Sequence, residues 1–195
     1  MGLFEAYDKH LEQLTEIGAR VCRALEAAEI EYRIIGGLAV FYYVVARDPL
    51  LARLTKDVDL AVNRADLDRI AAAVRPHGLE YRHVAGVDMI VDSERPKARS
   101  AVHLIFVGEK VRPEYLFPVP AFSKPERNEE GYLLIPIADL LKMKLTSLRL
   151  ADKTHVADMD KVGLITPAIE QQLPPALLAR LQQIRAEERQ SSGAE

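Results

Sequence analysis

One stretch of the sequence constrains the fold more than any other. An apolar run ends in Gly36-Gly37, a further apolar segment follows, and Asp57-Val58-Asp59-Leu60 lies beyond it. A strand that ends in two glycines and turns directly into a helix leaves backbone N–H groups open to an anion, because glycine has no side chain to block the approach. In an alternating strand, both aspartates point to one face and the apolar residues to the other. The stretch therefore predicts a strand, a helix and a second strand that carries two carboxylates.

The paired carboxylates have two interpretations. Two negative charges at neighbouring positions of one strand face repel each other, and a divalent cation between them removes the conflict. Mg²⁺ suits such a pair because it takes one or two carboxylates and completes its coordination with water and phosphate oxygens. Alternatively, Asp57 and Asp59 form the solvent-facing side of an edge strand. Gly36-Gly37 is likewise either a phosphate-binding turn or a tight turn without a ligand.

The composition is that of a globular protein: 195 residues, of which 49% are hydrophobic and 28% are charged. A formal net charge of −3 argues against a broad basic surface for nucleic acid. Cys22 is the only cysteine, so one chain forms no disulfide and no thiolate zinc site, which fits a reducing cytoplasm. The N-terminal residues lack the apolar core of an export signal, and the uncharged run 34–46 is shorter than the roughly 20 residues of a membrane span. We therefore expect a cytoplasmic protein without a membrane segment.

Hydrophobic periodicity predicts an α/β (α+β) fold. Strands are expected over residues 31–35, 57–62, 79–84, 87–91, 101–107 and 132–135, with a polar loop over 123–131. Helices are expected over 3–29, 36–47, 64–75, 136–149 and 153–162, and two more begin at Thr166-Pro167 and Pro174-Pro175. This order indicates a small mixed sheet flanked by helices. We expect a core with an N-terminal helix over 1–135, a helical C-terminal part over 136–190 and a disordered tail over 191–195.

A lysine interrupts the apolar stripe of the helix predicted over 136–149. Lys144 falls in the middle of a stripe formed at helical spacing by Ile137, Leu140, Leu141, Leu145 and Leu148. Burying an unpaired ammonium group is costly, so Lys144 either extends its amine to solvent or meets a negative partner.

These residues resemble a known family. Gly36-Gly37 followed by the segment 53–60 (RLTKDVDL) is similar to the G-G/G-S and h-D-h-D-h signatures of the DNA polymerase beta-type nucleotidyltransferases. The R-x-T-x-D-h-D form is closest to the branch that contains the abortive-infection nucleotidyltransferase toxins and related bacterial proteins. The signatures and the element order cover about residues 30–160.

A second part of the resemblance lies in the C-terminal helices. The family's K-L-x-A-x-x-x-R-x-K-D-x-x-D helix pair has a loose counterpart in Lys144, Arg149, Lys153 and Asp158. Asp152 precedes Lys153 here instead of following it, which is a departure from the family pattern.

The resemblance implies a reaction and a set of site residues. The reaction is transfer of a nucleoside monophosphate from an NTP to an acceptor hydroxyl, with Mg²⁺ or Mn²⁺ as cofactor and pyrophosphate as the leaving group. Asp57 and Asp59 are implied as catalytic metal ligands. The residues implied to bind the nucleotide are Gly36, Gly37, Thr55, Lys56 and Lys144. The acceptor stays open among RNA, protein and small molecules, including an antibiotic.

His103 departs from the pattern, because active family members carry a third carboxylate at the corresponding strand position. An imidazole there weakens binding of a second metal, acts as general base toward the acceptor hydroxyl, or is held by its neighbours in a structural role. The sequence shows no partner that would fix its tautomer, which favours the first of these interpretations. The other candidates for the missing carboxylate are Asp88, Asp92 and Glu109.

The missing carboxylate also supports a second class of function. In this alternative the protein is catalytically inactive and binds a nucleotide or a protein partner in a toxin-antitoxin or other regulatory system.

Two smaller features of the sequence involve other polar residues. His155 and Asp158 lie one helical turn apart, but two ligands without a third make no metal site. Arg95, Lys97 and Arg99 form a basic loop that either is solvated or contacts phosphates of the acceptor.

Overall fold

The computed structural model describes residues 16–55, 57–96 and 101–192, and it has a mixed α/β architecture. A helix over residues 16–27 precedes the first strand. The strands are β1 (Tyr32–Ile35), β2 (Val58–Val62), β3 (Leu79–Val84), β4 (Val87–Asp92), β5 (Val102–Phe106), β6 (Glu126–Arg127) and β7 (Leu133–Leu134). The helices are α2 (Gly36–Val45), α3 (Leu67–Val74), α4 (Ile137–Ser147), α5 (Leu150–Lys161), α6 (Pro167–Glu170) and α7 (Pro175–Ser192), with short 3₁₀ turns, η1 (Arg64–Asp66) and η2 (Arg75–His77), on either side of α3.

The described strands form one mixed sheet in the order β3-β4-β5-β2-β1-β7-β6. At its centre, β2 pairs antiparallel with β1 and parallel with β5. The register places Asp59 opposite Ile35 on one side and opposite His103 on the other. Because directly opposed residues point to the same face of a sheet, these three side chains share one face. The end of β1, where α2 begins, therefore lies beside the starts of β2 and β5.

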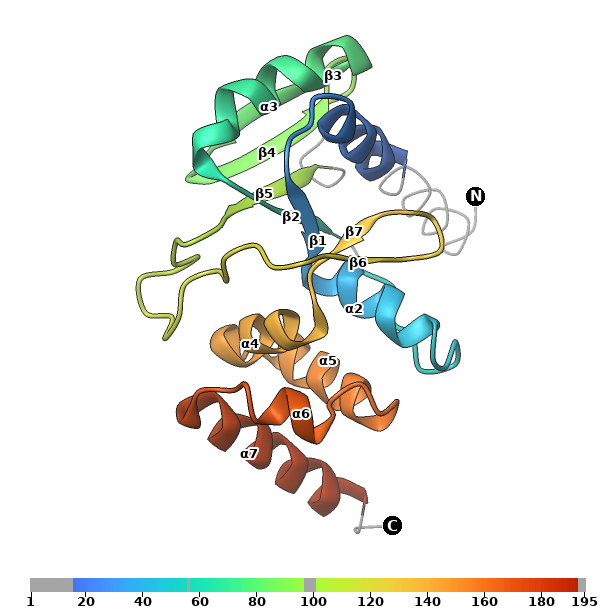
Figure 1. Ribbon diagram of the computed structural model, residues 1–195, viewed down its shortest axis with the longest axis vertical. Helices are drawn as coiled ribbons and strands as arrows, with labels where there is room; N and C mark the ends of the chain where they lie inside the picture. The colour runs from blue at the N-terminus through green and yellow to red at the C-terminus, as the bar shows by residue number, and fades with distance from the viewer. Residues whose placement is uncertain (1–15, 56, 97–100, 193–195) are drawn as a thin grey trace.

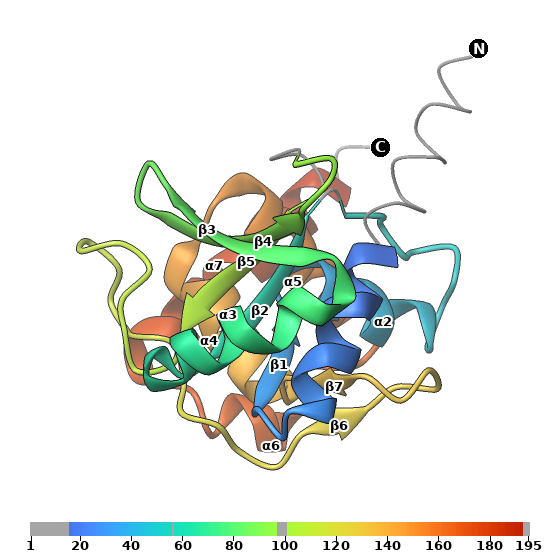
Figure 2. The same cartoon turned by 90° about the horizontal axis from the view of Figure 1, so that it is seen from above.

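The two faces of the sheet are covered by different helices. Figure 2 shows α3 and the helix over 16–27 in front of the sheet and α4, α5 and α7 behind it. The first face is apolar, and its buried residues include Val58, Leu60, Val102 and Leu104. Figure 1 shows α4 to α7 gathered beyond the end of the sheet that lies away from α3. This arrangement leaves the face that carries Asp59 and His103 directed toward the C-terminal helices.

Most helices and strands predicted from the hydrophobic periodicity are present, and they differ from the prediction mainly in where they begin and end. Asp57 precedes β2, because Thr55 forms a local turn in which the backbone N–H of Asp57 donates to Thr55 Oγ1 at 3.3 Å. The loop expected over 123–131 contains the short strand β6. The helix α4 ends at Ser147, because Leu148 has a left-handed backbone with φ of 49°.

The C-terminal helices pack on the rest of the chain. α2 contacts both α4 and α5, and α7 contacts the same two helices. The helix α7 extends through Ser192, two residues into the segment expected to be a disordered tail. None of the helices among the described residues combines the length and the apolar character that a membrane span needs. A separate C-terminal domain beginning at residue 136 stays a prediction.

Candidate active site between the sheet and the C-terminal helices

Asp59 packs directly against Gly36, the first residue of α2. Gly36 has φ of +70°, a backbone conformation that residues with side chains rarely adopt. A Cβ atom at Gly36 would lie 2.2 Å from Asp59 Oδ2, so the carboxylate occupies the space that a side chain would fill. Position 36 therefore requires glycine for two reasons: the positive φ and the close approach of the Asp59 carboxylate. The turn and the carboxylate strand form one site.

Gly37 makes the corresponding close contact with Thr55. A Cβ atom at Gly37 would lie 2.7 Å from Thr55 Oγ1 and 3.5 Å from His155 Cε1. Ile35 is the N-cap residue of α2, and its apolar side chain accepts no hydrogen bond from the first N–H groups of the helix. Gly37, Thr55 and His155 therefore meet beside the start of α2.

An ion pair holds the segment that leads into β2. Arg53 Nε donates to Asp158 Oδ2 at 2.6 Å, and Asp158 on α5 is only 2% exposed. The arginine of the R-x-T-x-D-h-D signature thus ties this segment to the C-terminal helices, just before Thr55 and Asp57. Lys56 lies outside the described residues.

His103 contacts Asp59 across the parallel strands β2 and β5. His103 Nδ1 lies 3.2 Å from Asp59 Oδ1, and both side chains are half-buried. The hydrogen bond to Asp59 raises the pKa of His103, burial opposes this shift, and the charge of Asp57 adds to it. The structure therefore brings Asp59 and His103 into contact, with the charge of Asp57 near enough to add to the pKa shift, and supplies the orienting partner for the imidazole that the sequence did not reveal.

None of the three acidic residues considered as a third carboxylate joins this group. Met89 lies opposite His103 in the register of β4 and β5, so its neighbour Asp88 points to the other face of the sheet. There Asp88 interacts with Tyr81 Oη and His83 Nδ1. Asp92 pairs with Arg20, and Glu109 pairs with Arg64.

Lys144 and Asp152 form a buried ion pair at the corner between α4 and α5. Lys144 is 4% exposed, Asp152 is 1% exposed, and Lys144 Nζ donates to Asp152 Oδ1 at 3.1 Å. Burial lowers the pKa of Lys144, and the charge of Asp152 opposes this shift. Arg149 Nε and Ser147 Oγ each donate to Asp152 Oδ2 at 2.7 Å. The lysine in the apolar stripe therefore meets a negative partner rather than solvent.

Asp152 is the site residue that the sequence analysis did not assign. Burial acts to raise its pKa, but Arg149, Lys144 and Ser147 together hold it at about 2. Its carboxylate is shared by two cations, so this corner retains positive charge. Two signals pointed to it: its position three residues after Arg149 in a helix and the need of the buried Lys144 for an anion.

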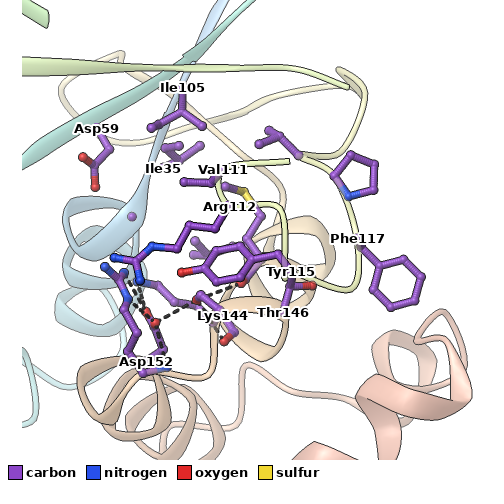
Figure 3. Close-up of a pocket in the computed structure, with 17 residues that line it drawn as sticks. Ile35, Asp59, Ile105, Val111, Arg112, Tyr115, Phe117, Lys144, Thr146 and Asp152 are labelled. Atoms are coloured by element: carbon purple, nitrogen blue, oxygen red, sulfur yellow. Dashed lines mark hydrogen bonds and ion pairs between the residues drawn. The ribbon is translucent and has the colours of Figure 1, made fainter. Parts of the chain in front are cut away.

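A cavity of about 180 Å³ connects this corner to Gly36 and Asp59. Figure 3 shows its walls: Ile35 and Ile105 on the sheet side, Lys144, Thr146 and Asp152 on the helix side, and Val111, Arg112, Tyr115 and Phe117 from the connection between β5 and β6. The aromatic residues Phe41, Tyr42 and Tyr43 of α2 line a different cavity. Arg95 is exposed, and Lys97 and Arg99 lie outside the described residues.

The donor set suits one hard cation. Asp57 and Asp59 provide carboxylate oxygens, and Mg²⁺ bound by two carboxylates fills its remaining positions with water and phosphate oxygens. Within residues 16–55, 57–96 and 101–192, no cluster of three or more His, Cys, Asp or Glu side chains is arranged to hold a metal by itself. A cation at these two carboxylates would take its remaining ligands from water or from a bound phosphate.

Comparison with known proteins identifies the architecture. No protein-family model matches this chain, and no curated protein matches it. An antigenic nucleotidyltransferase-like protein from Paracoccidioides brasiliensis is similar in structure, with a TM-score of 0.59 at 19% identity over 94% of this chain and 92% of that chain. ANT(2″)-Ia in complex with adenylyl-2″-tobramycin is also similar, with a TM-score of 0.51 at 12% identity over 91% of this chain and 99% of that chain. The chain therefore has a nucleotidyltransferase-like fold.

Proposed function

We propose that this protein transfers a nucleoside monophosphate from an NTP to an acceptor hydroxyl. The observation that carries the proposal is the contact between Gly36 and Asp59, because it joins a turn suited to phosphate to a carboxylate suited to a cation. A divalent cation, Mg²⁺ or Mn²⁺, held by Asp57 and Asp59 would neutralise charge on the triphosphate. The fold and the motif around residues 53–60 support the polymerase beta-type superfamily, and the R-x-T-x-D-h-D form supports its abortive-infection branch.

Backbone and side-chain groups around the cavity bind different parts of the triphosphate. The backbone N–H groups of Gly36 and Gly37 donate to its oxygens, and Lys144 and Arg149 contribute the positive charge of the α4–α5 corner. Thr55 and Lys56, which precede Asp57, adjust the position of the phosphates. Arg53, through Asp158, keeps this segment in place.

In the transfer step, the acceptor oxygen forms a bond to the α-phosphorus while the bond from that phosphorus to the bridging oxygen breaks. The bridging oxygen keeps the electron pair and leaves as part of pyrophosphate. The acceptor proton passes to a base. We assign this role to His103; its contact with Asp59 supports the assignment, because it engages Nδ1 and leaves Nε2 for the proton.

The candidate acceptors are RNA, protein and small molecules, and experiment distinguishes among them. The test is incubation of the full chain with each NTP, labelled at the α-phosphate, together with Mg²⁺ and total RNA, protein extract or a small-molecule extract. We expect a labelled product with wild type that disappears in the Asp57→Ala, Asp59→Ala double variant.

Asp68→Ala is the matched control, because Asp68 is an exposed aspartate on α3, which covers the opposite face of the sheet. It should retain wild-type transfer. Transfer that persists in the double variant would overturn the proposal. Binding of Mg²⁺ and NTP without any labelled product would instead favour the inactive, nucleotide-binding alternative.

A further inference from the structure

The connection between β5 and β6 forms a loop that carries one inward-facing tyrosine. Two backbone hydrogen bonds close the base of this loop, because Gly108 donates to the oxygen of Val119 and Val119 donates to the oxygen of Glu109, each at 2.9 Å. Residues 110–114 between them are exposed, whereas Tyr115 is half-buried. The loop is thus fixed at its base, and its side chains mostly face solvent except where Tyr115 turns inward.

The hydroxyl of Tyr115 points into the cavity beside Asp59. Figure 3 shows the ring extending inward from the loop, and Gly36 and Asp59 line the same cavity. An electrostatic effect agrees with this placement. The hydrogen bond to Asp152 is the main cause that raises the pKa of Arg149, burial opposes it, and the charge of Tyr115 adds to it. The phenolic oxygen therefore lies on the side of the cavity that carries the cationic corner.

The other hydroxyls around the site are engaged or enclosed. Ser147 Oγ donates to Asp152 Oδ2 at 2.7 Å. Thr55 Oγ1 donates to a backbone oxygen two residues further along at 3.2 Å. Thr146 Oγ1 is enclosed by the protein and cannot be reached from the cavity. Among the residues that the structure describes, no hydrogen-bond partner is found for Tyr115 Oη. Tyr115 thus supplies a hydroxyl that faces the cavity and is free to react.

We propose that Tyr115 is itself an acceptor, so that the protein attaches a nucleoside monophosphate to its own tyrosine hydroxyl. The proposal rests on the proposed function and adds to it a modification site within this chain. An acceptor must approach the α-phosphorus of an NTP whose phosphates lie against Gly36 and Lys144, and the cavity lined by these two residues also holds Tyr115. A hydroxyl held beside its reaction partner reacts as if it were present at high concentration, which favours transfer within one chain.

The transfer step is the same as for any other acceptor hydroxyl. Tyr115 Oη forms a bond to the α-phosphorus while the bond from that phosphorus to the bridging oxygen breaks. The bridging oxygen keeps the electron pair and leaves as part of pyrophosphate. The phenolic proton passes to His103, the base assigned above. The product is a phosphodiester that joins the tyrosine oxygen to the nucleoside.

The test follows the label from the NTP into the protein itself. The purified full chain is incubated with Mg²⁺ and each NTP labelled at the α-phosphate, without an added acceptor, and the labelled peptide is identified by mass spectrometry. We expect Tyr115 to gain the mass of one nucleoside monophosphate less water, and a phosphodiesterase to release that nucleotide. A label on any other residue in place of Tyr115 would overturn the assignment.

Tyr115→Phe keeps the ring and removes only the acceptor oxygen. We expect it to lower the self-label by about tenfold or more, because no other hydroxyl is held in the same position. Tyr132→Phe is the matched control, since Tyr132 is also half-buried but lies just before β7 and does not line this cavity. It should be labelled as wild type is. Equal labelling of Tyr115→Phe and wild type would overturn the assignment.

A mixture of two variants tests whether the transfer stays within one chain. The Asp57→Ala, Asp59→Ala double variant keeps Tyr115 but lacks the catalytic carboxylates, whereas Tyr115→Phe keeps the carboxylates but lacks the acceptor. We expect neither variant to be labelled in the mixture. Label on the double variant would show that Tyr115 is reached by another chain, and it would overturn the placement of the hydroxyl in its own site.

Failure of this inference and failure of the proposed function give different results. Wild type that labels added RNA or a small molecule but not itself overturns the assignment of Tyr115 alone. Absence of label in wild type with every NTP and every acceptor overturns both. Label on Tyr115 that disappears in the Asp57→Ala, Asp59→Ala double variant supports both.

Discussion

Asp59 and His103 lie opposite each other in the neighbouring parallel strands β2 and β5, with Asp59 Oδ1 3.2 Å from His103 Nδ1. A carboxylate at this distance holds an imidazole in one orientation and favours the tautomer with the proton on Nδ1. The same carboxylate packs against Gly36 through its other oxygen, Oδ2. Asp59 thus connects the histidine to the Gly36-Gly37 turn, and this connection makes the role of His103 testable.

His103→Ala should lower turnover by about 100-fold, the scale of general acid–base catalysis, while the NTP dissociation constant changes little. The reason is that Nε2 of the oriented imidazole is available to take the acceptor proton. Steady-state kinetics and calorimetry measure the two quantities separately. His103→Asp is the informative companion, because a carboxylate is a poorer base near neutral pH and a better metal ligand. Higher turnover with tighter Mg²⁺ binding in His103→Asp would show that His103 replaces a lost metal ligand.

Gly36→Ala should weaken binding of Mg²⁺ and NTP by about tenfold or more, because the new Cβ displaces the Asp59 carboxylate by about an ångström. Gly108→Ala is the matched control. Gly108 also has positive φ, +77°, but a Cβ there would have no neighbour within 4 Å. Both variants should lose about 1–2 kcal/mol of unfolding free energy from backbone strain in urea denaturation. Equal binding by the two variants would remove the special role of Gly36.

Asp152→Asn should destabilise the protein by about 3–5 kcal/mol, because it leaves the Lys144 ammonium buried without its counterion. Asp66→Asn breaks the more exposed pair with Arg69 and serves as control, with a much smaller loss expected. Urea denaturation at neutral pH gives both values. Replacing the pair by Lys144→Met with Asp152→Leu should recover much of the loss. Failure of this double variant to recover stability would mean that the pair does more than compensate charge.

The R-x-T-x-D-h-D arginine should act on binding as well as on folding. Arg53→Ala releases the segment before Thr55 and Asp57 from Asp158, so we expect weaker binding of Mn²⁺ and NTP, together with a loss of unfolding free energy because the buried Asp158 carboxylate loses this partner. Arg47→Ala changes another exposed arginine, just beyond the end of α2, and should bind both ligands as wild type does. Electron paramagnetic resonance of Mn²⁺ reports the metal affinity. The idea fails if both arginine variants bind Mn²⁺ equally well.

His155 should make stability depend on pH. Burial, together with the nearby Lys144 cation, lowers the pKa of His155 to about 4. The unfolded chain, with a histidine pKa of about 6.5, therefore binds a proton between pH 6.5 and 4 that the folded chain does not. Stability should fall by about 2–3 kcal/mol as the pH drops through this window and then level off below it.

His155→Gln tests this dependence, because glutamine does not titrate. The difference in unfolding free energy between wild type and His155→Gln, measured by urea denaturation from pH 4 to 8, isolates the contribution of this residue from that of the carboxylates. A difference that is constant across the range would show that His155 titrates normally in the folded protein.

Local patterns in the sequence determined the elements and the motif. Apolar residues recur with a period of two in the central strands and of 3.6 in α4. These periods depend only on which nearby residues share a face, so they can be recognised without knowledge of the rest of the chain. Gly36-Gly37 and the alternating aspartates were informative for the same reason, because a turn conformation and a strand face are properties of a few consecutive residues. Asp57 shows the limit, because it lies before β2, in a turn where its backbone hydrogen-bonds to the Thr55 side chain.

The tertiary structure alone decided which of these residues meet. Arg53 and Asp158 are separated by 105 positions, and Asp59 and His103 by 44, so no local period relates them. The cavity beside Asp59 forms where the end of β1, α4 and the connection that carries Tyr115 come together. A sequence pattern specifies the face on which a side chain lies, but the packing of one face against another depends on the whole chain at once. That packing brings Gly36, Asp59, Lys144 and Asp152 to the wall of one cavity.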